Sequence, residues 1–137
     1  MKKILLVLIG VSVTLLADFS RSSEGVVTDS VTNLQWQDDY IKLANWRDAI
    51  AYCNELSLDG GGWRVPNKNE LLSIVDYTKY NPVIDSSFQN TTSGYYWSST
   101  THANYSSSAW VVGFRNGFSN YNNKAYNSYV RCARSGQ

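Results

Sequence analysis

The sequence "NWRDAIAYCNEL", residues 45–56, predicts a helix with one apolar face. Asn45 is a favourable N-cap, and Asp48 lies three residues later, near the positive end of the helix dipole. The apolar residues follow the i, i+3, i+4 rule and so share one face, which comprises Trp46, Ala49, Ile50, Cys53 and Leu56. We therefore expect Cys53 on the buried side of this helix.

The chain has two cysteines, Cys53 and Cys132, and a single histidine, His102. In an oxidising compartment, an isolated pair of cysteines most simply forms one disulfide. The alternatives are a metal site and a nucleophilic cysteine, but both need partner residues that a chain with one histidine does not offer. We expect a Cys53–Cys132 disulfide, no metal site and a surface position for His102.

The N-terminus "MKKILLVLIGVSVTLLA" predicts an export signal over residues 1–17, followed by a short segment, 18–24. Two lysines precede an apolar run, Ile4 to Leu16, which is too short for a comfortable membrane span. Leu15 occupies a position where a small residue favours cleavage, so cleavage after Ala17 and retention as an anchor both stay open. We expect a periplasmic, secreted or surface-associated protein, without a stable membrane span once the signal is cleaved.

The length and charge of the chain limit its partners. The 137 residues correspond to one domain. Lys and Arg total 12 and Asp and Glu total 11, which leaves a net charge of +1 without a basic run. Binding to nucleic-acid phosphates needs clustered cations, so we do not expect nucleic acid as a partner.

A second helix is predicted within "WRVPNKNELLSIVDY", residues 63–77. Asn67 and Glu70 have the spacing of a capping box, and the apolar side comprises Leu71, Leu72, Ile74 and Val75. We interpret Arg64, Pro66 and Glu70 as structural residues, because proline favours an extended entry and Arg64 can pair with a carboxylate. The earlier segment "GVVTDSVTNLQWQDD", residues 25–39, predicts two short strands with Val26, Val27, Leu34 and Trp36 inward.

The remainder of the chain is expected to form strands at "YYWSST", "SAWVVGF" and "SYVRCARS", residues 95–100, 108–114 and 128–135. Asn116-Gly117 predicts a tight hairpin turn. That turn would place three pairs on the core face, Phe114 with Ser119, Val112 with Tyr121 and Trp110 with Asn123, and would leave Val111 on the outer face. We interpret residues 118–128 as an exposed, locally irregular edge.

Seven segments in this order resemble a bacterial family of domains of unknown function, also called the Lcl (collagen-like adhesin) C-terminal domain. They are "VTDSVTNLQWQDD", "NWRDAIAYCNEL", "WRVPNKNELLSIVDY", "NPVID", "YYWSST", "AWVVGF" and "YVRCAR", which span the domain predicted over residues 25–135. The resemblance implies an α+β, C-type-lectin-like fold, with two helices packed on a small twisted antiparallel sheet. A disulfide from the first helix to the last strand fits this fold.

The resemblance implies adhesion and ligand binding at bacterial surfaces. True C-type lectins use Glu-Pro-Asn or Gln-Pro-Asp and Trp-Asn-Asp motifs for calcium, and this chain has neither. Residues 86–137 contain no Asp or Glu, whereas calcium needs carboxylate ligands. No base, metal or reactive thiol converges either, so we expect neither an enzyme nor a cofactor.

The C-terminal part is dense in Tyr, Ser, Gly and Asn, which are the residues of adaptable binding loops. We predict contacts to an extracellular glycan or protein from Tyr105, Arg115, Asn120, Tyr121, Asn122, Asn123, Tyr126 and Asn127. Tyr121 is also a candidate core residue beside Val112. Two alternatives stay open: a structural envelope protein without a soluble ligand, and a hypervariable lectin-like protein diversified by a retroelement.

Overall fold

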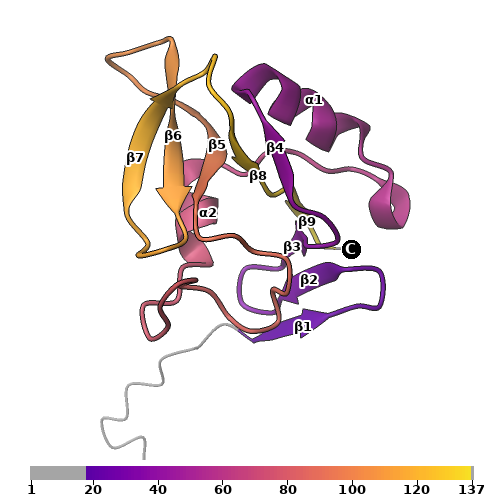
Figure 1. The fold of residues 1–137 in the computed structure, drawn as a ribbon. Helices are drawn as coiled ribbons and strands as arrows, with labels where there is room; N and C mark the ends of the chain where they lie inside the picture. The colour runs from indigo at the N-terminus through magenta and orange to yellow at the C-terminus, as the bar shows by residue number, and fades with distance from the viewer. Residues whose placement is uncertain (1–17, 137) are drawn as a thin grey trace, which may run out of the picture.

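The computed structural model describes residues 18–136, which form an α+β domain with two sheets and two α-helices (Figure 1). One sheet has the strand order β1-β2-β3-β9 and the other has the order β4-β8-β5-β6-β7. The elements are β1 (Phe19–Arg21), β2 (Val26–Asp29), β3 (Leu34–Gln37), β4 (Lys42–Ala44), α1 (Trp46–Glu55), η1 (Leu58–Gly60), α2 (Lys68–Ser73), β5 (Tyr95–Thr101), β6 (Ser108–Gly113), β7 (Ser119–Asn123), β8 (Ser128–Val130) and β9 (Ala133–Ser135). The predicted signal, residues 1–17, lies outside the described residues.

Both predicted helices form, with the predicted caps. The Asn45 side chain accepts the Asp48 N–H at 2.9 Å at the start of α1. Asn67 and Glu70 form a reciprocal capping box at the start of α2. Arg64 donates two hydrogen bonds of 2.7 Å to the Glu70 carboxylate, so the structural interpretation of this pair is confirmed.

The predicted disulfide joins α1 to the segment between β8 and β9. Cys53 and Cys132 are 5.5 Å apart at their Cα atoms and both are fully buried. Ala49 and Cys53 of α1 pack with Trp97, Val111 and other residues in one core cluster. The disulfide therefore links α1 to the junction of the two sheets within this cluster.

The predicted last strand, residues 128–135, is divided between the two sheets. β8 pairs with β4 and β5, whereas β9 pairs with β3. The break falls at Arg131 and Cys132, because the Cys132 carbonyl accepts the Gln37 N–H and the Arg131 side chain turns inward to Asp38. The expectation of a single antiparallel sheet was wrong in two respects, since there are two sheets and β5 runs parallel to β8.

The β6–β7 hairpin forms, but its predicted register was wrong by two residues. Val112 pairs with Ser119 and Trp110 with Tyr121. Phe114 cannot pair with Ser119, because its N–H donates to the Gly94 carbonyl and its carbonyl accepts the Val83 N–H. The hairpin therefore turns through residues 114–117, closed by a 2.8 Å hydrogen bond from the Gly117 N–H to the Gly113 carbonyl.

The five-stranded sheet is covered on both faces around β6. Val111 packs in the cluster under α1, and Val112 packs in a second cluster with Leu71 of α2 and Phe114. The expectation that Val111 lies on an outer face was therefore wrong, since its exposure is 0%. By contrast, four of the five residues of β7 are exposed, which confirms an exposed edge, although β7 is a regular strand.

Asp38 is the centre of a buried polar network that ties the two sheets together. It has no exposed surface, and it forms ion pairs with Arg21 and with Arg131, the latter at 2.6 Å. The backbone N–H of Gln89 donates to the same carboxylate at 2.7 Å. The neighbouring Asp39 is exposed, so its side chain does not join this buried network.

Candidate ligand-binding site

Four aromatic side chains gather where β6, β7 and the β5–β6 loop meet. We call His102, Tyr105, Trp110 and Tyr121 the aromatic cluster. His102 is central, because its ring centroid lies 5.0 Å from that of Tyr105, 4.9 Å from that of Trp110 and 4.5 Å from that of Tyr121. The Tyr105 and Tyr121 rings stack at 5.5 Å, with 18° between their planes.

The cluster is open to solvent at its two tyrosines. Tyr105 is 54% exposed and Tyr121 is 42% exposed, whereas His102 and Trp110 are half-buried beneath them. Aromatic rings that are already packed against one another lose little freedom when a ligand binds. The cluster therefore offers a preorganised apolar surface with two phenol groups.

The β5–β6 loop is held by its own hydrogen bonds, which position two members of the cluster. The His102 N–H donates to the Ser108 carbonyl at 2.9 Å, and the Ser108 N–H donates to the Tyr105 carbonyl at 2.8 Å. His102 Nδ1 accepts the Asn104 N–H at 3.1 Å. The β5–β6 pairing shifts register between Trp97 and Thr101, just before this loop. The loop is thus a defined support for His102 and Tyr105.

Lys68, at the start of α2, adds a cation to the cluster. Its Nζ lies 3.6 Å from the centroid of the Trp110 ring, within the range of a cation–π interaction. The backbone N–H of Lys68 donates to Thr100 Oγ1 at 3.0 Å, which ties α2 to the end of β5. No carboxylate comes from residues 86–137, so the loop and strands of the cluster carry no negative charge.

The structure brings together part of the predicted ligand-binding set. Tyr105 and Tyr121 stack in the cluster, and Tyr121 lies beside Trp110 instead of Val112. Side chains alternate along a strand, so Asn123 shares the face of Tyr121. Three predicted residues therefore lie on one surface, on the α2 side of the sheet.

The other predicted residues lie elsewhere. Asn120 and Asn122 point to the α1 side, where the Asn122 amide donates to Ser128 Oγ at 3.1 Å. Arg115 is exposed in the β6–β7 turn, at the far end of the hairpin, and Tyr126 is 68% exposed in the β7–β8 turn. The eight predicted residues do not form one continuous site.

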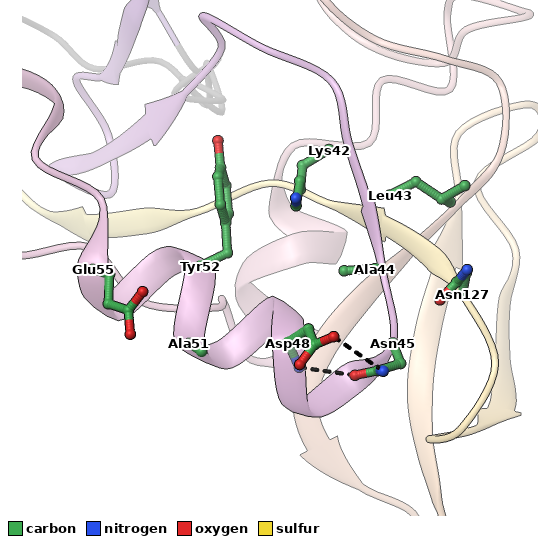
Figure 2. A pocket seen from close by; sticks show the side chains of 9 residues that line it. All are labelled: Lys42, Leu43, Ala44, Asn45, Asp48, Ala51, Tyr52, Glu55 and Asn127. Carbon is green, nitrogen blue, oxygen red and sulfur yellow. Dashed lines mark hydrogen bonds between the residues drawn. The ribbon is translucent and has the colours of Figure 1, made fainter.

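Asn127 belongs to a separate polar pocket of about 510 Å³ between α1 and β4 (Figure 2). Lys42 and Tyr52 line one part of this pocket, and the carboxylates of Asp48 and Glu55 project from α1 (Figure 2). Lys42 Nζ lies 5.4 Å from the centroid of the Tyr52 ring. Burial is the main cause that raises the pKa of the Tyr52 phenol, with smaller contributions from Asp39 and Tyr40.

Sequence reasoning missed three residues of the candidate site: His102, Trp110 and Lys68. The sequence interpretation placed His102 on a bland polar surface and Trp110 in the core. The correct hairpin register would have set Trp110 opposite Tyr121 and revealed the pair. No sequence signal places Lys68 over Trp110, because that contact depends on how α2 docks on β5 and β6.

Within residues 18–136, no group of three His, Cys, Asp or Glu side chains is placed to hold a metal ion. Both cysteines are in the disulfide. Over the same residues, no helix combines the length and the apolar character needed to cross a membrane.

Comparison with known proteins identifies one family. The Lcl C-terminal domain matches residues 25–134, which is most of the chain and includes both helices, the disulfide and the aromatic cluster. No curated protein matches the chain.

Proposed function

The chain belongs to the Lcl C-terminal domain family, and on this basis we propose that it is an exported adhesion module. In this proposal it binds an extracellular glycan or protein through the aromatic cluster, without calcium and without a catalytic step. The observation that carries the proposal is the stack of Tyr105 and Tyr121, exposed and supported from below by His102 and Trp110.

The chemistry of the cluster suits both ligand classes. Aromatic rings stack on the apolar faces of sugars and on protein side chains, and Tyr gives a large contact area at a small entropy cost. The Tyr hydroxyls and the Asn123 amide can form hydrogen bonds with sugar hydroxyls or with backbone groups. Lys68 supplies a cation over Trp110, whereas Lys124 Nζ lies 4.1 Å from the centroid of the Trp46 ring, on the α1 side of the sheet.

The proposal includes the C-type-lectin-like fold that the resemblance implies. Three features support this classification: two helices, the packing of both helices on the five-stranded sheet, and a disulfide from α1 to the C-terminal segment. Calcium independence is supported by the lack of any Asp or Glu in residues 86–137, which include the whole β5–β6 loop and β7.

An array of glycans and extracellular-matrix proteins tests the proposal. The wild-type protein should bind at least one class of ligand, equally well in calcium and in a chelator. The Tyr105→Ala/Tyr121→Ala variant should lose this binding, because it removes both exposed rings of the cluster. A matched control, Tyr80→Ala/Tyr126→Ala, removes two tyrosines that are 69% and 68% exposed outside the cluster, and it should bind as the wild type does.

Thermal unfolding of the same variants separates binding from folding. Both double variants replace exposed side chains, so we expect each to retain most of its stability, with changes of about 1 kcal/mol or less. Two results would count against the proposal: a folded cluster variant that binds normally, or a wild-type protein that binds nothing on the array. The second result would favour a structural envelope protein without a soluble ligand.

A further inference from the structure

The outer edge of the five-stranded sheet is formed by β7 (Figure 1). Two hydrogen bonds of 2.8 Å close the ends of the β6–β7 ladder. The Gly113 N–H donates to the Phe118 carbonyl, and the Lys124 N–H donates to the Ser107 carbonyl. Hydrogen-bonded pairs alternate in an antiparallel ladder, so Asn120 and Asn122 bond to β6. The backbone groups of Ser119, Tyr121 and Asn123 consequently point away from β6, toward the free edge.

This edge lacks the usual protection against pairing with another strand. Proteins protect edge strands by shortness, charge, proline, bulges or a covering element. The other edge of the same sheet, β4, has three residues, carries Lys42 and leads directly into α1. In contrast, β7 has five residues, no charge, no proline and an uninterrupted register with β6.

We propose that β7 pairs in an antiparallel manner with β7 of a second copy of this chain, about a twofold axis at Tyr121. The sequence "SNYNN" is self-complementary in this arrangement. Ser119 faces Asn123 of the second copy, Asn120 faces Asn122, and Tyr121 faces Tyr121. Every facing pair combines hydroxyl with amide, amide with amide or aromatic with aromatic, and no like charges meet.

The edge must exchange one internal hydrogen bond before it pairs. Asn120 Oδ1 accepts the Tyr121 N–H at 2.8 Å, so the amide side chain shields the outward donor at the proposed axis. Pairing replaces this bond with one to the Tyr121 carbonyl of the second copy. At the other end of β7, the Asn123 carbonyl already accepts the Tyr126 N–H at 3.0 Å, so pairing is centred on Tyr121.

The proposed pairing sets the two aromatic clusters next to each other, because Tyr121 belongs to both the cluster and the axis. The resulting surface would present two clusters to one ligand. This inference concerns self-association and does not depend on what the cluster binds. A strand of five residues contributes a small interface, so we expect association that is reversible and dependent on concentration.

Sedimentation velocity over a range of concentrations tests the pairing, with the protein purified in the form that its native host produces. Ser119→Lys/Asn123→Lys places lysines opposite each other at both ends of the paired strands. Ser119→Lys/Asn123→Glu is the matched control, because it changes the same positions but places opposite charges across the axis. Within one copy the two positions are about 13 Å apart, so their mutual effect on the monomer is small.

We expect the wild type to shift from the monomer toward the dimer as its concentration rises. The variant with two lysines should remain monomeric, and the lysine–glutamate variant should associate again, more strongly at low salt. Circular dichroism checks that both variants are folded. The inference is overturned if the wild type stays monomeric, if the variant with two lysines associates as the wild type does, or if the lysine–glutamate variant also remains monomeric. Pairing of monomeric wild type with an unrelated extended peptide would likewise overturn the assignment of a second copy.

Discussion

Two regions of this domain differ in how they use polar and aromatic residues. At the junction of the two sheets, Asp38, Arg131 and the Cys53–Cys132 disulfide are buried and bonded to several elements. At the β6–β7 edge, Tyr105 and Tyr121 are exposed and contact mainly other members of the aromatic cluster. The buried contacts at the junction stabilise the fold, whereas the tyrosine rings at the edge remain accessible to partners.

The two regions should therefore respond to substitution in opposite ways. A buried charge that loses its partner pays the full cost of desolvation, whereas an exposed ring contributes little to folding. Changes at the junction should therefore lower the free energy of unfolding, and changes at the edge should affect partners.

Removal of the disulfide should have the largest effect. The bridge spans 79 residues, and the loss of a cross-link of this span destabilises a domain by about 4 kcal/mol in the chain-entropy model. We expect the Cys53→Ala/Cys132→Ala variant to unfold at a much lower urea concentration than the wild type. An unchanged unfolding midpoint would show that the junction does not depend on this bond.

Asp38→Ala should have the next largest effect and lower the free energy of unfolding by about 3 kcal/mol or more. The substitution leaves the Arg131 guanidinium, which is only 2% exposed, without its carboxylate partner. Asp39→Ala is the matched control at the neighbouring, exposed position, and it should cost less than about 1 kcal/mol. Urea unfolding of both variants measures the difference. Equal losses for the two substitutions would contradict the central role of Asp38.

The junction also shows where sequence reasoning reaches its limit. Helix caps and the cysteine pair are local or compositional signals, so α1, α2 and the disulfide were predicted correctly. The break between β8 and β9 depends on the contact of Arg131 with Asp38, 93 residues away in the sequence. No pattern within "SYVRCARS" reveals that contact, so the segment was predicted as a single strand.

Glu70 caps α2, the helix that carries Lys68 of the candidate site. Its contribution to the free energy of unfolding should depend on pH. The hydrogen bonds from Arg64 are the main cause that lowers the pKa of Glu70 from its ordinary value of 4.5. The ionised carboxylate therefore stabilises the folded state above about pH 4.5, and this contribution is lost as the pH falls through the lowered pKa of the folded state.

Glu70→Gln should cost about 0.5 to 1 kcal/mol at pH 7 and almost nothing in acid below the lowered pKa. Glu55→Gln is the control, since Glu55 is exposed on α1 and forms no ion pair with the residues described in the structure. Thermal unfolding from pH 7 down to pH 3 measures both. A Glu70→Gln cost that stays constant over this range would rule out the charged form as the source of the stabilisation.

The candidate site was predicted only in part, for a physical reason. The composition of residues 102–129 led to a predicted binding surface that includes Tyr105 and Tyr121, the two exposed rings of the aromatic cluster. The hairpin register was set by Phe114, whose backbone bonds to two other segments, and this shift moved Tyr121 from Val112 to Trp110. The cluster itself arises from three segments that meet only in the folded chain.

We expect ligands to act at the edge and to leave the junction unchanged, and the five tryptophans report on both regions. Trp110 lies in the cluster, while Trp36 and Trp97 are fully buried. We would label the tryptophans with fluorine, assign the resonances with single Trp→Phe variants, and titrate the protein with the strongest ligand from the array. We expect the Trp110 resonance to shift and the Trp36 and Trp97 resonances to keep their positions. An unchanged Trp110 resonance in the presence of bound ligand would contradict this expectation.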